Sequence, residues 1–504
     1  MNFWQFITKA ITTVLLITST ICPSGIIAKN VDMKICVDTK KTEQNITGWG
    51  TSACWWSQNI SDPETRTDVA KKLYSKDGLG LNIYRYNIGG GVNPEHNRVG
   101  NPWRNTESFY YFNENSGKYE YDFTRDANAQ AFLDEALKYG CIDTVILFTN
   151  SPHYSMTISG EAGGSFEAGG VSNLAKEHYQ DYVDYFLTIT EYFIKKGVPV
   201  KYISPINEPQ WDWGGEWVGQ EGCHYNPEQV YELLALFSKG IDERGLNVKL
   251  SCPESGNIGS TTKNYFNSIA ADSELYKNVA SFAYHSYWAD NDFKIKKDFG
   301  KWISKQNFNG RTVDMTEWCE LPCEHAVDDI KSAAIMARVI SNDVTQSKAN
   351  SWTSWVAVNQ TGVGEDGLNY SDGLLYANDD FSEYGTAARY YALGHFSKFV
   401  PSGSVALKAT SNKNTVYDYD YTAGDNKVNK MLKTNYSAFK TPDGKIVLII
   451  INEADKRNIK LGALSDNMEI YTTDSEYKLE KTYSGAAQSK ITVAKDSITT
   501  VVFA

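Results

Sequence analysis

Two glutamates follow apolar runs that are typical of buried β-strands. Glu208 comes after Lys201–Ile206 within the tripeptide Asn-Glu-Pro, and Glu317 ends the run Arg311–Glu317. If both runs belong to one parallel barrel, their carboxyl ends meet at the same mouth. Two facing carboxyls are what glycoside cleavage requires, because one protonates the leaving oxygen while the other attacks or directs water. A single glutamate is usually a solvated surface residue, so the hypothesis depends on the pair. Asn207 could hydrogen-bond a sugar hydroxyl beside the scissile bond.

Eight short runs of β-forming residues alternate with segments of helical periodicity. Helices are expected to begin at Asp62-Pro63-Glu64 and Asn226-Pro227-Glu228, where a proline follows a capping residue. Because parallel neighbours need a crossover connection, eight such units over about 350 residues predict an α/β fold, a (β/α)8 TIM barrel. The expected strands are Gly48–Trp56, Leu81–Ile88, Thr144–Thr149, Lys201–Ile206, Val248–Cys252, Ala280–Tyr287, Arg311–Glu317 and Trp352–Val358.

The pattern changes near residue 400, where short strands with polar turns replace helical periodicity. Thr441-Pro442-Asp443-Gly444 is a turn signal before the strongly β-forming run Lys445–Asn452. We expect an antiparallel β-sandwich docked rigidly on the barrel. The predicted domains are a signal peptide at 1–28, an N-terminal segment contributing to the sandwich at 29–47, the barrel at 48–395 and the C-terminal β-sandwich at 396–504.

The N-terminus indicates export. Lys9 precedes a short apolar run, residues 10–21, and small residues follow up to Ala28. This is typical of a signal peptide and too short for a membrane span, so we expect a secreted protein without a transmembrane segment. Seven cysteines remain after residue 28, an odd number that does not describe a disulfide scaffold. Cys319 and Cys323 could form a bridge. A zinc site of these two with His325 is the weaker alternative, because further ligands are missing.

Composition argues against some classes of partner. The 504 residues carry a net charge of −12, which gives no basic footprint for nucleic acid. Aromatic residues make up 13% of the chain, with 13 Trp and 32 Tyr. This excess fits either large cores or a cleft in which sugar rings stack on indole and phenol rings.

Six motifs together resemble glycoside hydrolase family 30. They are INEPQ, TEWCE, YRYNIGGG, NSPHYSMT, YHSYW and YYALGHFSKFV, and the resemblance runs from about Gly48 to the C-terminus. Asn-Glu-Pro alone is moderately specific, whereas six motifs in the same order are strongly specific. The resemblance implies a retaining barrel glycosidase with an appended β-sandwich. It implies Glu208 as acid/base and Glu317 as nucleophile, after the fourth and seventh strands.

Such a pair works through the charge that each group places on the other. In a retaining enzyme the two carboxyls lie roughly 5–5.5 Å apart. At that distance ionised Glu317 favours the protonated form of Glu208, which then protonates the departing oxygen as Glu317 attacks. Once Glu317 is a neutral ester, Glu208 can take a proton from water. No metal or other cofactor is needed.

The resemblance also assigns residues around the glutamates. Arg85 would lie near the nucleophile and help to keep it ionised, a role that is compatible with a structural salt bridge. His285 and Tyr287 match the His-x-Tyr after the sixth strand, and Tyr287 could donate a hydrogen bond to Glu317. Trp355 would form the floor of the sugar subsite. Candidate walls, with core packing as the alternative for each, are Trp55, Trp56 and Tyr154.

Two further segments indicate which sugar is cleaved. Gly48–Ser52 with the following Trp55-Trp56, and Gln220–His224, resemble the endo-β-1,6-galactanase branch of the family. We therefore hypothesise that the substrate is β-1,6-galactan side chains such as those of arabinogalactan. A β-1,6-glucanase and a xylanase are the alternatives within the family.

Two other classes of protein share some of these features. A carbohydrate-binding protein that has lost catalysis could have the same aromatic content, but it usually lacks one of the two glutamates. A metal-dependent hydrolase would show clustered His and Asp ligands at strand ends, and seven scattered histidines do not supply them. We expect a monomer that binds a polysaccharide.

Overall fold

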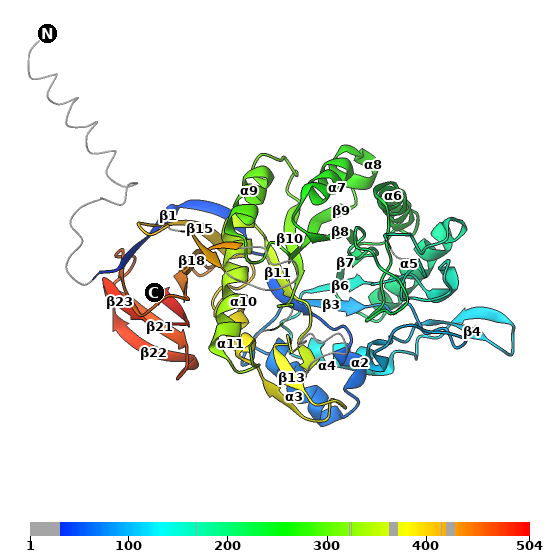
Figure 1. Ribbon diagram of the computed structural model, residues 1–504, viewed down its shortest axis with the longest axis horizontal. Helices are drawn as coiled ribbons and strands as arrows, with labels where there is room; N and C mark the ends of the chain where they lie inside the picture. Colours follow the sequence, from blue (N-terminus) through cyan, green and yellow to red (C-terminus); the bar gives the residue numbers. More distant parts are fainter. Residues whose placement is uncertain are drawn as a thin grey trace, which may run out of the picture.

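The computed structural model describes residues 31–167, 169–321, 323, 325–361, 371–414, 416–419 and 429–504. These residues form a barrel with a β-sandwich at its side (Figure 1). The predicted signal peptide lies outside the described ranges. Within them, no helix combines the length and the apolar character needed to cross a membrane.

Eight parallel strands close the barrel in the order β10-β11-β2-β3-β6-β7-β8-β9. The predicted TIM barrel with its appended sandwich is therefore confirmed. The strands are β2 (Gly48–Ser52), β3 (Ile83–Asn87), β6 (Thr144–Phe148), β7 (Val200–Ser204), β8 (Lys249–Asn257), β9 (Val279–Tyr287), β10 (Thr312–Trp318) and β11 (Ser351–Ser354).

Helices connect these strands and cover the outside of the barrel (Figure 1). Two of them begin at the predicted caps: the Asp62 side chain accepts from the N–H of Thr65, and Asn226 forms a reciprocal capping box with Gln229. These contacts satisfy N–H groups that a helix start leaves unpaired. The helices are α2 (Trp56–Asn59), α3 (Pro63–Tyr74), α4 (Ala127–Leu137), α5 (Tyr179–Lys195), α6 (Pro227–Glu243), α7 (Ser260–Ala271), α8 (Ser273–Tyr276), α9 (Phe293–Ile303), α10 (Ile330–Asn342) and α11 (Ala388–Ser397).

Strand β8 continues past its predicted end at Cys252. Ser255 and Asn257 still pair with β9, and the register shifts between Pro253 and Ser255 and again between Ser255 and Asn257. A proline lacks the N–H that a ladder needs, so the sequence pattern placed a break there. The extension brings Glu254 and Gly256 to the mouth of the barrel.

A nine-stranded sheet, in the order β22-β21-β24-β19-β18-β15-β1-β20-β23, builds the sandwich. The N-terminal strand β1 pairs antiparallel with β15 and parallel with β20, so the two ends of the chain share this sheet. Its strands are β1 (Met33–Asn45), β15 (Val405–Ser411), β18 (Thr434–Lys440), β19 (Ile446–Asn452), β20 (Arg457–Leu461), β21 (Asn467–Thr473), β22 (Lys478–Ala486), β23 (Lys490–Val493) and β24 (Ser497–Phe503).

Strand β19 joins the two parts of the molecule because both of its faces are buried. Ile446, Leu448 and Ile450 belong to the core of the sandwich, whereas Val447 and Ile449 pack into the core of the barrel domain. Helices α10 and α11 lie between the barrel strands and this sheet (Figure 1). A strand buried on both faces is apolar at every position instead of alternating, which explains the uninterrupted apolar run.

Candidate active site

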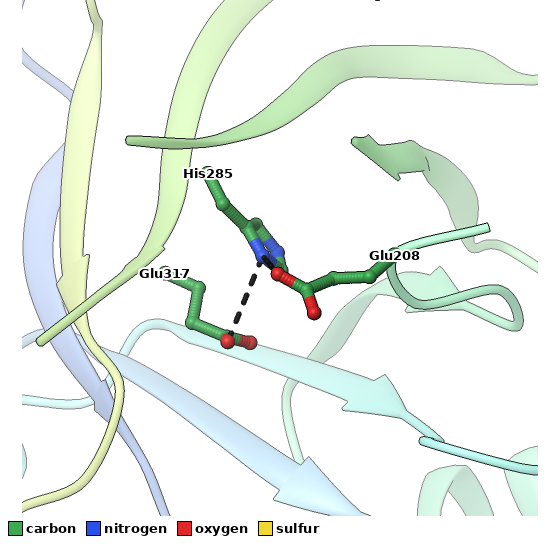
Figure 2. Close-up of side chains that lie close together, drawn as sticks. All are labelled: Glu208, His285 and Glu317. Carbon is green, nitrogen blue, oxygen red and sulfur yellow. Dashed lines mark hydrogen bonds and ion pairs between the residues drawn. The ribbon is translucent and has the colours of Figure 1, made fainter. Parts of the chain in front are cut away.

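Glu208 and Glu317 meet at the carboxyl end of the barrel. Glu317 lies in β10, and Glu208 follows β7. One carboxylate oxygen of each, together with a ring nitrogen of His285, lie within 4.8 Å of one another. Figure 2 shows both carboxylates turned toward the imidazole. The side chain of Glu208 is 12% exposed and that of Glu317 is 5% exposed, so each keeps a small surface that faces the solvent.

His285 is fully buried and lies between three carboxylates. Its Nδ1 is 2.8 Å from Oε1 of Glu208 and 3.6 Å from Oε1 of Glu317, while Nε2 is 3.1 Å from Oε2 of Glu254. Burial alone would lower the pKa of His285, but the charge of Glu317 and the hydrogen bonds to Glu208 and Glu254 raise it to about 9. The ring is therefore an imidazolium near neutral pH, with both nitrogens as donors.

Arg85 in β3 holds the nucleophile candidate from the other side. Its Nη1 donates to Oε2 of Glu317 at 2.6 Å, and its Nη2 donates to Oδ1 of Asn207 at 2.9 Å. Asn207 in turn donates to Oδ1 of Asn150 at 3.2 Å. The hydroxyl of Tyr287 donates to Oε1 of Glu317 at 3.2 Å. Both oxygens of Glu317 are thus fixed by donors, as a nucleophile aimed at one atom requires.

A third glutamate, Glu254 in β8, lies beneath the pair and is fully buried. Its carboxylate accepts from Ser204 at 2.8 Å and from the hydroxyl of Thr316, and it lies 3.6 Å from Nη2 of Arg85. Burial raises the pKa of Glu254, but Arg85 and His285 outweigh this and hold it below its ordinary value. The sequence analysis missed this residue. The strand-end rule would have found it if the fifth strand had been continued through Pro253.

Neighbouring positive charges and burial also have opposite effects on the pKa of Glu317. Burial raises the pKa of its carboxyl most, and Glu208 adds to this rise; His285 and Arg85 lower the pKa without cancelling the rise, so it stays above its ordinary value. A buried carboxylate needs such compensation to stay ionised, since an isolated buried charge would take up a proton instead.

Backbone geometry fixes the position of Glu208. Its φ of +45° is in the left-handed region, and its N–H donates to the carbonyl of Glu254 at 2.9 Å. Gly256 provides the space beside it, because a Cβ there would lie 2.9 Å from Oε1 of Glu208. Non-glycine residues rarely adopt a positive φ, and they persist there only when the surroundings impose it.

The aromatic residues predicted around the site have different surroundings. The ring of Trp355, 7% exposed, lies with its centroid 6.0 Å from the Arg85 guanidinium and makes an edge contact with Trp55 at 5.2 Å. Trp55 is only 2% exposed and belongs to the hydrophobic core, so the prediction that it forms a wall of the cleft is wrong, and it packs against Trp355 instead. Tyr154 is half-buried beside His153 and Tyr119.

The prediction that Trp56 lines the cleft is wrong. β2 ends at Ser52, and Trp56 begins the short helix α2, which turns its ring into the core. The fully buried ring packs edge-on against Phe132 of α4 at 4.6 Å, and Nε1 donates to the carbonyl of Ser52 at 2.9 Å.

The cysteines near the nucleophile are not bridged. Cys319 and Cys323 are free thiols with different partners: Cys319 lies 3.6 Å from the hydroxyl of Tyr287, and Cys323 donates to the carbonyl of Glu320 at 2.9 Å. These two candidates therefore do not form a bridge. Nδ1 of His325, the third residue of the alternative zinc site, faces Asp329 at 3.6 Å.

Among the described residues, the spacing that a metal ion would need occurs at Glu208, His285 and Glu317. A cation would there compete with Arg85 for Glu317, and it would have to displace the proton of His285. The donor set therefore suits proton transfer and nucleophilic attack by a carboxylate better than metal binding.

Comparison with known protein families shows to which class of protein the chain belongs. The model of the O-glycosyl hydrolase family 30 matches residues 32–291, and the model of the glycosyl hydrolase family 30 β-sandwich domain matches residues 403–501. The chain belongs to glycoside hydrolase family 30. The resemblance read from the six motifs is thereby confirmed, and the protein is a glycoside hydrolase.

Proteins similar to this chain include a galactanase and a xylanase. An endo-β-1,6-galactanase of Hypocrea rufa is 23% identical over 419 residues, which cover 79% of this chain and 80% of the relative. A conserved exported protein from Bacteroides fragilis has a TM-score of 0.77 at 22% identity, covering 93% of this chain and all of the other. The catalytic domain of a family 30 xylanase C from Talaromyces cellulolyticus has a TM-score of 0.67 at 18% identity, over 94% of this chain and 100% of the other.

Proposed function

We propose that this hydrolase is a secreted retaining enzyme that cleaves β-1,6-galactan chains internally. The observation that carries the mechanism is the pair Glu208 and Glu317, whose oxygens lie within 4.8 Å. This separation suits direct attack by one carboxylate and leaves little room for the interposed water of an inverting enzyme.

The charges around the pair support the assignment of roles. Arg85 and the imidazolium of His285 lie against Glu254 and Glu317 and balance their charges. Glu317 is held on both oxygens by donors, as a nucleophile should be, and Glu208 has the more exposed side chain, as a proton donor to an incoming chain should.

The reaction then proceeds in two steps. Glu208 gives its proton to the glycosidic oxygen while Glu317 attacks the anomeric carbon, so the bond to the leaving sugar breaks and an ester forms. The ester removes the negative charge from Glu317. Glu208 can then accept a proton from water, which attacks the same carbon and releases Glu317 as a carboxylate.

The choice of galactan is supported by the relative from Hypocrea rufa, which aligns with four-fifths of its own length, and by the segments Gly48–Ser52 and Gln220–His224. A β-1,6-glucanase is the second candidate, since a solved endo-β-1,6-glucanase has a TM-score of 0.64. Secretion is supported by the signal-peptide pattern of residues 1–28.

Product analysis tests which polysaccharide the enzyme cleaves. Purified enzyme is incubated with β-1,6-galactan, β-1,6-glucan and xylan, and Glu317→Gln serves as the control for contaminating activities. We expect galactose oligomers as the main early products, which also shows internal cleavage. Turnover of glucan or xylan alone would overturn the choice of galactan and leave the mechanism standing.

A further inference from the structure

Two exposed tryptophans stack on each other at the mouth of the barrel. Trp211 is 44% exposed and Trp288 is 58% exposed, and their ring centroids lie 4.8 Å apart at an interplanar angle of 26°. Indole surface in water is unfavourable, and exposed apolar patches on soluble proteins commonly mark binding sites. The catalytic residues described above do not use this pair.

Both tryptophans are attached directly to the catalytic residues. The N–H of Trp211 donates to the carbonyl of Glu208 at 3.0 Å. Trp288 follows Tyr287, the donor to Glu317, and the rings of the two neighbours make an edge contact at 6.0 Å. The stacked pair therefore lies on the side of the mouth where Glu208 enters the site.

The pair is held in place on both sides. Nδ1 of His224 lies 3.0 Å from the carbonyl of Trp211, and Nε1 of Trp213 donates to the carbonyl of Glu208 at 3.3 Å. Trp288 has a φ of +58°, a conformation that a bulky residue adopts only when its surroundings impose it. These contacts orient the two rings before any ligand arrives, which lowers the entropic cost of binding.

We propose that Trp211 and Trp288 form the platform for the leaving-group part of the saccharide. This inference rests on the proposed function. The proton donor must contact the glycosidic oxygen, so the sugar beyond that oxygen lies next to Glu208. The sugar that becomes the ester lies on the other side, against Glu317 and Trp355. The apolar face of a pyranose ring matches an indole face, and stacking tolerates flexible linkages.

Two substrates distinguish binding by this platform from the action of the residues that form the ester. β-1,6-Galactotetraose can place sugars on both sides of the scissile bond, whereas β-1,6-galactobiosyl fluoride carries only fluoride as its leaving group. Both form the same ester with Glu317. The same measurements are made with β-1,6-glucotetraose and gentiobiosyl fluoride. Turnover by wild type then shows whether galactose or glucose is preferred, and the variants show whether Trp211 and Trp288 bind the leaving sugar.

The variants are Trp211→Ala, Trp288→Ala and the double substitution. Trp217→Ala is the matched control, because Trp217 lies in the same loop and is 50% exposed, but it packs beside Gly100 and Gly219. We expect the double variant to lose roughly 10- to 100-fold in kcat/KM on the tetrasaccharide, in line with the loss of one to two buried aromatic contacts. Its kcat/KM on the glycosyl fluoride should stay within about twofold of wild type.

The outcomes are distinguishable. An equal loss on both substrates would mean that the pair only supports the catalytic residues, and no loss on the tetrasaccharide would mean that the leaving sugar binds elsewhere. Either result overturns the platform. A preference for the gluco substrates would instead overturn the galactan assignment, and the comparison within that series would still test the platform.

Discussion

His285 and Glu254 form an ion pair with no exposed surface, in which Nε2 lies 3.1 Å from Oε2. The other ring nitrogen faces Glu208 and Glu317. Glu254 therefore acts on the two catalytic candidates through the imidazolium, which it orients and keeps charged. Breaking a buried pair is costly because it leaves an uncompensated charge.

Glu254→Gln should impair both stability and catalysis. The substitution keeps the shape but removes the charge that balances His285 and Arg85. We expect a loss of about 3–5 kcal/mol in the free energy of unfolding, measured in urea, and a fall in kcat of at least about tenfold. Glu274→Gln is the control, because that side chain is 82% exposed and should show no measurable change. Wild-type stability in Glu254→Gln would show that the buried pair contributes nothing.

The charge on His285 should make the free energy of unfolding decrease at alkaline pH. Its pKa is raised in the folded state, from an ordinary 6.5 to about 9, so its contribution is complete below pH 6.5 and is lost as the pH rises through 9. The amount is roughly 3 kcal/mol. Urea unfolding of wild type and His285→Gln between pH 6 and 10 tests this. Wild type should lose its advantage with rising pH, and parallel curves would contradict the account.

Gly256→Ala should affect catalysis more than folding. The new Cβ would lie 2.9 Å from Oε1 of Glu208, the end of a side chain that can move aside. The displaced carboxyl would no longer reach the glycosidic oxygen. We expect kcat/KM on oligosaccharides to fall by roughly 10- to 100-fold, because a misplacement of about 1 Å can cost that much. Thermal unfolding should remain unchanged.

Gly462→Ala is the control for this substitution, since nothing lies within 4 Å of a Cβ there. Glycosyl fluorides provide a second control. Fluoride leaves without protonation, so the kcat/KM of Gly256→Ala on glycosyl fluorides, which reports formation of the ester, should stay almost normal. Its kcat should fall, because the displaced Glu208 must still take a proton from the water that hydrolyses the ester. An equal loss on fluorides would place the damage at Glu317 instead.

The meeting of the two candidate glutamates could be predicted because a simple geometric rule covers it. Parallel strands bring their carboxyl ends together, so Glu208 and Glu317 meet although they are far apart in the sequence. The double burial of β19 could also be anticipated from its uninterrupted apolar run, since exposed faces introduce polar residues.

Other features of the site could be recognised only from the structure. Glu254 was missed because Pro253 interrupts the strand pattern, although the ladder with β9 continues past it with register shifts. The prediction for Trp56 was wrong because β2 ends at Ser52, before the predicted end of the strand at Trp56. A small error in a strand end is enough to assign a residue that faces the core to the cleft. The stacking of Trp211 on Trp288 joins two loops, and no local pattern in either one encodes it.

Trapping the covalent intermediate tests the central claim most directly. In a 2-deoxy-2-fluoro-β-galactosyl fluoride, fluorine at C2 destabilises the positively charged transition states of both steps, whereas the anomeric fluoride is a good leaving group and restores the first step. The ester should therefore form and then hydrolyse slowly, so that it accumulates. Peptide mass spectrometry of the inactivated enzyme should place the sugar on Glu317, and Glu317→Gln should remain unlabelled. A sugar attached to Glu208 or Glu254, or equal labelling of Glu317→Gln, would contradict the proposed roles.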